Sequence, residues 1–172
     1  MILVLPVQYT KIDFMKELQG KELEEGMKFI KEAVRASKKS PCKKSQRGAV
    51  LVKNGKIISI GYNGAPKDKV CDPCLRENIK DNSRTELCHA IHAEQRAILN
   101  ALRKGYDLTD SRLYHIKVKN NKTIPTDDIS CTLCSRLILE SGVSEMALLH
   151  TYGLFVYDAE EYNNLNFDYF LK

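Results

Sequence analysis

The spacing of apolar side chains changes along the chain and predicts a helix followed by a hairpin. Between residues 21 and 36 apolar side chains recur every three or four positions, which predicts an amphipathic helix with a charged outer face. Two short β-rich runs follow at 48–52 and 56–60, and Asn54-Gly55 lies between them. Because both residues of Asn-Gly tolerate positive φ, this pattern predicts an antiparallel hairpin.

The second half of the chain predicts alternating helices and strands. The segment 61–88 is rich in Gly, Pro, Asp, Asn and Cys and is expected to form a long loop. After it we expect a helix at about 90–104, a strand at 111–118, a polar loop through Asp128, a helix at 131–141, a strand at 145–150 and a helix at 158–164. Strand–helix–strand crossovers favour parallel pairing. The expected fold class is therefore α/β, a three-layer α/β/α sandwich with a mixed central sheet.

No internal repeat, low-complexity linker or shift in composition marks a domain boundary within the 172 residues. A chain of this length is most simply one domain with a single core. We therefore expect residues 1–172 to form one domain. Within it, 1–20 is an N-terminal extension and 158–172 is a C-terminal helical segment packed on the domain.

The composition is that of an ordinary globular protein, with 43% hydrophobic and 28% charged residues. Its apolar runs are too short to span a bilayer, and the apolar start lacks a basic leader and is interrupted by Pro6. We expect a cytoplasmic protein without a membrane partner. In that compartment six cysteines favour metal binding over a disulfide framework.

The formal net charge is +5, and part of the excess is concentrated early in the chain. The clustered basic residues are Lys38, Lys39, Lys43, Lys44 and Arg47. They fit a solvated helix end and loop, and they also fit attraction to a phosphate-bearing ligand, either a nucleotide or a nucleic acid. Charge alone does not separate these interpretations.

The most informative chemistry lies in two short motifs, each at the start of a predicted helix. His92 and Glu94 form an H-x-E motif, and Cys131 and Cys134 form a C-x-x-C motif. A histidine and two cysteines can hold zinc and leave its fourth position to water, which is typical of a catalytic site. Glu94 is suited to moving protons. A lone C-x-x-C is often a structural zinc or redox pair, but the conjunction is the pattern of zinc-dependent nucleobase deaminases.

Three stretches carry a resemblance to a known family. They are 44–66, which contains Gly-Tyr-Asn-Gly-Ala-Pro at 61–66, then 88–95, and 131–134. Over roughly residues 25–165 the chain resembles deoxycytidylate (dCMP) deaminases of the cytidine deaminase superfamily. The resemblance implies a cytidine deaminase-like fold and hydrolysis of dCMP to dUMP and ammonia. Zinc-bound water would be the nucleophile, and Glu94 would shuttle the protons.

The resemblance also implies contacts and partners. Asn63 would contact the nucleotide near the active site, although Gly, Asn and Pro at 61–66 also fit a simple turn. Arg103 stands where similar proteins carry an arginine, and a nucleotide or interface contact and a solvated helix end are both compatible with it. Related proteins are commonly homo-oligomers, and many respond to dCTP and dTTP as effectors.

The remaining cysteines suggest a second metal. Cys42, Cys71, Cys74 and Cys88 could close the coordination sphere of a structural zinc and tether the long loop. Related dCMP deaminases often carry a second zinc in this region. His89 is the reserve ligand if one cysteine is not used, and the alternative is that some of these are buried free thiols.

Some features depart from the family pattern. Ser130 replaces the usual proline before the first zinc cysteine, Arg96 replaces a usual asparagine, and the segment 117–129 is longer than is typical. The last two bear on substrate choice, so the alternative substrates are another cytosine, adenine or guanine nucleoside or base, or a tRNA adenosine. A zinc-bound module without activity is a further alternative, against which Glu94 argues.

A nucleic-acid partner is not expected. Recognition of RNA calls for stacking aromatic side chains on a basic surface, and the chain has 8% aromatic residues and no tryptophan. Four aromatic residues near the end of the chain could stack bases, but they fit a core better: Tyr152, Phe155, Tyr157 and Tyr162.

Overall fold

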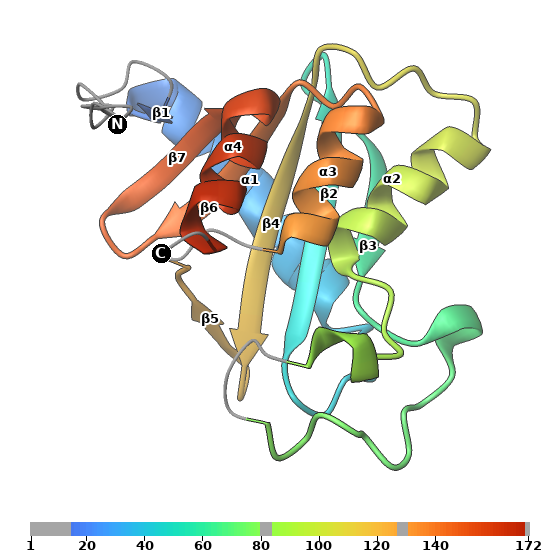
Figure 1. The fold of residues 1–172 in the computed structure, drawn as a ribbon. Helices are drawn as coiled ribbons and strands as arrows, with labels where there is room; N and C mark the ends of the chain where they lie inside the picture. The colour runs from blue at the N-terminus through green and yellow to red at the C-terminus, as the bar shows by residue number, and fades with distance from the viewer. Residues whose placement is uncertain (1–14, 80–83, 127–130, 171–172) are drawn as a thin grey trace, which may run out of the picture.

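The computed structural model describes residues 15–79, 84–126 and 131–170, in which a mixed β-sheet lies between layers of helices (Figure 1). The helices are α1 (Gly20–Ser37), α2 (Ala93–Arg103), α3 (Thr132–Glu140) and α4 (Ala159–Phe170). The strands are β1 (Met15–Glu17), β2 (Gln46–Lys53), β3 (Lys56–Tyr62), β4 (Ser111–Lys119), β5 (Lys122–Ile124), β6 (Glu145–His150) and β7 (Gly153–Asp158). Two 3-10 helices, Pro66–Asp68 and Thr85–Leu87, lie in the long segment before α2.

The sheet has the strand order β1-β7-β6-β4-β2-β3, and β5 pairs with β4. The predicted hairpin is confirmed, because β2 and β3 are antiparallel and Asn54 and Gly55 both have positive φ, 52° and 70°. The predicted parallel pairing is confirmed between β4 and β6, where His115 lies opposite Leu148. Helix α3 forms the crossover between these two strands.

The two faces of the sheet bury separate apolar clusters, which confirms the three-layer α/β/α prediction. Helix α1 covers one face and packs Ile30 and Ala33 against β2, β4, β6 and β7. Helices α2, α3 and α4 cover the opposite face, where Ile98, Ile138 and Tyr162 are fully buried. In Figure 1 α1 lies behind the sheet and the other three helices lie in front of it. No helix of the described ranges is long and apolar enough to cross a bilayer.

Three strands were absent from the predicted elements. Strand β7 forms an antiparallel hairpin with β6, and β1 pairs with β7 at the sheet edge, with Met15 opposite Tyr157. The neighbouring Leu18 is buried and its backbone N–H donates to Leu154 O at 2.9 Å. The described end of the expected N-terminal extension therefore belongs to the sheet. The predicted polar loop after β4 contains β5 as far as Ile124, and residues 127–130 lie outside the described ranges.

The predicted helix from residue 90 begins later, at Ala93. Ile91 forms an isolated antiparallel bridge with Gly64, in which Ile91 N–H donates to Gly64 O at 2.9 Å. This pairing holds the chain extended and postpones the helix until after His92, whose backbone is also extended. His92 is consequently the N-cap residue of α2.

Strand β3 and helix α2 approach so closely that only glycine fits between them. A Cβ atom on Gly61 would lie 2.1 Å from the backbone oxygen of Ala93 and 2.5 Å from the backbone nitrogen of Ala97. Both neighbours are backbone atoms in the first turns of α2 and cannot rotate away. Gly61 therefore permits the direct backbone contact that seats α2 on the sheet.

Candidate active site

The start of α2 fixes the imidazole of the H-x-E motif. His92 is the N-cap residue, and its backbone N–H donates to Oε1 of Gln95 at 3.0 Å. This hydrogen bond satisfies a donor that the helix itself leaves unpaired and holds the first turn in place. The imidazole consequently projects from a defined point at the helix N-terminus.

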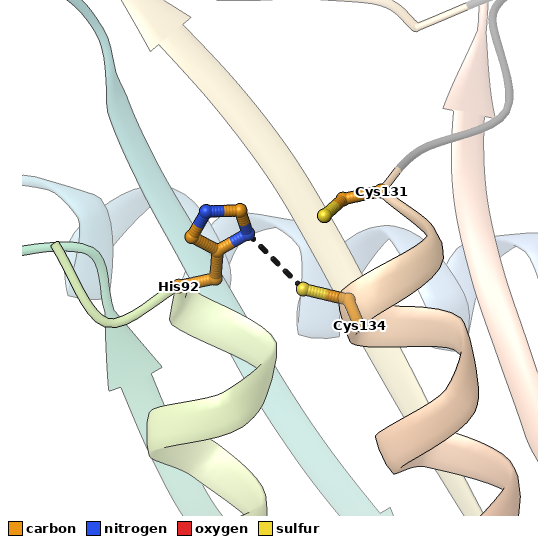
Figure 2. Close-up of side chains that lie close together, drawn as sticks. All are labelled: His92, Cys131 and Cys134. Atoms are coloured by element: carbon orange, nitrogen blue, oxygen red, sulfur yellow. Dashed lines mark hydrogen bonds between the residues drawn. The ribbon is translucent and has the colours of Figure 1, made fainter. Parts of the chain in front are cut away.

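The C-x-x-C motif occupies the equivalent position on α3. Cys131 is the N-cap residue, and Cys134 lies in the first turn, where its backbone N–H donates to Cys131 O at 2.9 Å. Cys134 is 0% exposed. Figure 2 shows both thiols pointing toward His92 from the adjacent helix, with His92 Nδ1 3.1 Å from Cys134 Sγ. Two helix N-termini, which favour negative charge, meet at this point.

The three side chains form a group that suits a metal ion. One ligand atom from each of His92, Cys131 and Cys134 lies within 4.8 Å of the others, and no other such group of three or more is found among the described residues. An imidazole nitrogen and two sulfurs are donors that zinc prefers. The donor set and its convergence therefore fit zinc.

The two thiols of the cluster have pKa values shifted in opposite directions. Hydrogen bonds from Cys134 and His92 lower the pKa of the Cys131 thiol to about 4 against the opposing effect of burial. The hydrogen bond with Cys131, together with burial, raises the pKa of Cys134. Because thiolates are the metal-binding form, the lowered pKa of Cys131 favours the form of that side chain that binds a metal.

Glu94 lies at the second position of α2 and is buried, with an exposed fraction of 2%, close enough to His92 and Cys134 to affect their charge. Its Oε2 atom is buried and has no hydrogen-bond partner among the described residues. Burial raises the pKa of this carboxyl, but His115, His92, a backbone hydrogen bond and Arg47 together lower it below its usual value. A buried carboxylate oxygen without a protein partner, beside a metal-ligand group, is suited to a substrate or a water molecule.

His115 is a neighbour of the site that the sequence prediction missed. It lies in the middle of β4, fully buried, with Nε2 3.6 Å from Glu94 Oε1. Burial lowers the pKa of His115 to about 4, so the ring is neutral at pH 7 and faces the carboxylate without a full charge. The available signal was a titratable side chain within the mainly apolar run Leu113–Ile116 of the predicted strand.

Asn63 is buried at the end of β3 and its amide is bonded to the segment before β2. Its Oδ1 accepts hydrogen bonds from Ser40 Oγ and from the backbone N–H of Arg47, both at 2.7 Å. Its Nδ2 donates to Ser45 O at 2.9 Å. Asn63 thus holds the end of β3 against residues 40–47, and its contact with a nucleotide stays a prediction.

Two other predicted features lie away from the cluster. Arg103 is exposed at the last residue of α2, about 14 Å along the helix axis from Glu94 at the usual rise per residue. The structure does not bring Arg103 to the metal-ligand group, and its contact with a nucleotide or at an interface stays a prediction. Phe155, Tyr157 and Tyr162 are buried, which confirms the core interpretation for them, whereas Tyr152 is 61% exposed.

The remaining cysteines line a single hollow of about 630 Å³ beside the long loop. Those that line it are Cys42, Cys71, Cys74 and Cys88, and exposed His89 lines it as well. Burial raises the pKa of the Cys71 thiol, and the other three cysteines add to the effect. They are near neighbours, but their ligand atoms are less tightly gathered than those around His92.

The sandwich and its cluster of one histidine and two cysteines near a buried glutamate define a zinc-binding deaminase. Comparison with known proteins supports this class: residues 23–150 match the family described as the cytidine and deoxycytidylate deaminase zinc-binding region, and the chain belongs to that family. It is 33% identical over 129 residues to a deoxycytidylate deaminase of Saccharomyces cerevisiae and 32% identical over 126 residues to one of Mycobacterium phage D29.

The shared lengths differ between these relatives. The matched region covers 73% of this chain but only 38% of the Saccharomyces cerevisiae protein, whereas it covers 69% of this chain and 88% of the phage protein. The matched region likewise covers only 37% of a deoxycytidylate deaminase of Schizosaccharomyces pombe. The chain thus spans less than two fifths of the length of either yeast relative.

Solved structures give the same fold. The dCMP deaminase of cyanophage S-TIM5 in complex with dCMP and dUMP aligns with a TM-score of 0.53 and 26% identity, covering 75% of this chain and 82% of that one. A cytidine deaminase from Burkholderia pseudomallei aligns with a TM-score of 0.55 at 22% identity, covering 79% of this chain and 94% of that one. The second likeness confirms the cytidine deaminase-like fold.

Proposed function

We propose that this protein hydrolyses dCMP to dUMP and ammonia at a zinc site held by His92, Cys131 and Cys134. The observation that carries the proposal is the buried, unpartnered Oε2 atom of Glu94 next to that ligand group. The nucleotide is supported by the similarity to dCMP deaminases and by the S-TIM5 protein, which was solved with dCMP and dUMP.

When bound at these ligands, zinc supplies a Lewis acid that lowers the pKa of a water molecule to about 7. Glu94 would take the two protons of the attacking water in turn, passing the first to the pyrimidine ring nitrogen and the second to the departing amine. The C4–N bond breaks, a C4–O bond forms, and ammonia leaves. The first turns of α2 and α3 hold Glu94 and the ligands in one orientation throughout.

A substrate panel tests the proposal. Purified, zinc-replete protein is offered dCMP, CMP, deoxycytidine, cytosine and a tRNA, and ammonia release is measured. We expect the highest kcat/KM for dCMP. Preference for another member would retain the zinc chemistry and replace the proposed substrate with another nucleotide, nucleoside, base or tRNA adenosine. No release from any of them would contradict the proposed activity.

We further propose a structural zinc bound by Cys42, Cys71, Cys74 and Cys88, which line one hollow. Two zinc ions per chain are expected by elemental analysis, falling to one in Cys71→Ser and in Cys74→Ser because a closed site needs all its ligands. Leu75→Ala, at an exposed residue of the same loop, is the control and should keep both ions. A wild-type content of one zinc would contradict the second site.

Variants also separate the two candidate ligand sets of this second zinc. Cys42→Ser that still binds two zinc ions, combined with loss of one ion in His89→Ala, would assign the fourth position to His89. Loss of one ion in Cys42→Ser with two ions kept in His89→Ala would assign all four positions to cysteine.

We also propose that the elements from β1 to α4 act as one deaminase domain and that Asn63 contacts the nucleotide. Support for the Asn63 contact is positional, because the adjacent Gly64 is paired to Ile91, the residue before His92. Assembly into a homo-oligomer, a response to dCTP and dTTP, and a cytoplasmic location are proposed from the family resemblance.

A further inference from the structure

Arg96 joins the loop after β3 to the helix that carries Glu94. Its Nη1 donates to Asp68 Oδ1 at 2.8 Å, and its Nη2 donates to the backbone oxygens of Gly64 at 3.0 Å and Ala65 at 3.2 Å. The guanidinium carbon lies 4.7 Å from the centre of the Tyr62 ring, so the cation also faces an aromatic surface. One side chain therefore contacts four residues of the segment 62–68.

Arg96, Asp68 and Tyr62 each contact the other two. Tyr62 hydrogen-bonds to Asp68, and burial together with this bond raises the pKa of the Tyr62 hydroxyl. The Arg96 side chain is only 14% exposed, whereas that of Asp68 is 57% exposed. The arginine is thus enclosed between the helix and the loop, and the aspartate is the outer member of the network.

The loop needs such a support because its backbone is unusual. Lys67 and Asp68 both have positive φ, 57° and 56°, a conformation that residues other than glycine rarely adopt. Such conformations persist where the surrounding contacts over-determine them. The hydrogen bonds from Arg96 hold the backbone just before this point, at Gly64 and Ala65, and the side chain of Asp68 at the point itself.

We propose that Arg96 is a positioning residue that holds the 62–68 loop against α2 and thereby sets the affinity for the nucleotide. The inference rests on the proposed function, because the loop contains the predicted nucleotide contact Asn63. Arg96 lies on the helix that carries Glu94, and it hydrogen-bonds to the part of the loop that directly follows Asn63. It therefore fixes the position of the loop relative to the first turn of α2, which carries Glu94, and does not itself touch the reacting atoms.

The test uses Arg96→Lys in the full chain, because lysine keeps the charge but lacks the planar group that bonds several acceptors at once. We expect KM for dCMP to rise about tenfold with kcat changed less than about threefold, as for lost preorganisation of a binding loop. We also expect trypsin to cleave after exposed Lys67 or Lys69 at least about fivefold faster, because local opening exposes the loop. Arg112→Lys is the matched control, since Arg112 pairs with Glu145 at 2.7 Å away from this loop.

A second variant keeps the test decisive if Arg96→Lys fails to fold. Asp68→Asn changes only the exposed partner of Arg96 and should shift KM and cleavage in the same directions by smaller factors. Unchanged KM, unchanged cleavage or a selective fall in kcat in the folded variants would overturn the inference. If wild-type protein does not turn over dCMP, the proposed function fails, and the cleavage rates still decide whether Arg96 restrains the loop.

Discussion

Replacing Glu94 by glutamine is expected to lower kcat for dCMP by about 10³-fold, within the range of about 10² to 10⁴ that general acid–base catalysis contributes. Glutamine has nearly the same shape but cannot accept and return a proton. Because Glu94 is buried and does not belong to the ligand group, zinc content should be unchanged. Ammonia release and elemental analysis on the same preparation measure both quantities.

The control for this variant is Glu140→Gln, which alters an exposed carboxylate at the last residue of α3 and should leave kcat unchanged. Activity of Glu94→Gln within tenfold of wild type would assign the proton transfers to another group. Loss of zinc in Glu94→Gln would instead show that the carboxylate supports the metal site, and the catalytic role would need a different test.

Replacing Cys134 by serine is expected to remove the zinc of the catalytic site and to reduce ammonia release below detection. The C–O bond of serine is shorter than the C–S bond of cysteine, and the hydroxyl stays protonated, whereas zinc binds a thiolate. Because Cys134 is fully buried in the first turn of α3, no other described side chain takes its place at the group. Zinc content per chain should fall by one.

Loss of the ion should also lower stability, since a ligand that binds only the folded state stabilises it by about 2.7 kcal/mol at a free concentration of 100 Kd. The Tm of wild type should therefore fall on chelation, and that of Cys134→Ser should fall by less, because the variant has only the proposed structural zinc left to lose. Leu133→Ala, between the two cysteines and exposed, should behave as wild type. A Cys134→Ser protein with full zinc content and activity would show that the cluster is not the catalytic site.

The parts of the fold that the sequence predicted are those set by local physics. The apolar stripe of α1 and the Asn54-Gly55 turn are encoded within a few residues, and both are confirmed. The H-x-E and C-x-x-C motifs were also readable locally, because each begins a helix whose first turn fixes its own side chains. That the two motifs lie side by side in space depends on the fold, and it could be expected from the sequence only through the resemblance to a family.

The missed features depend on contacts between distant parts of the chain. Strand β1 has only three residues, and its partner β7 comes from near the other end of the sequence, so no local pattern announces the pair. The neighbour of Glu94 is His115 because α2 crosses β4, which spacing alone does not reveal. Arg96 was visible only as a departure from a family pattern, and its contacts with Asp68 and Gly64 give it a physical role.

The direct backbone contact at Gly61 has a consequence for how this protein could change its substrate. At Gly61 the two backbones are in direct contact, so a side chain at this position would displace the first turns of α2 and with them Glu94. The loop at 62–79 is joined to α2 by hydrogen bonds from the Arg96 side chain, and its Gly64 pairs with Ile91 just before the helix. Evolution or a designer could therefore rebuild the loop for a new base and keep the hydrolytic centre in place.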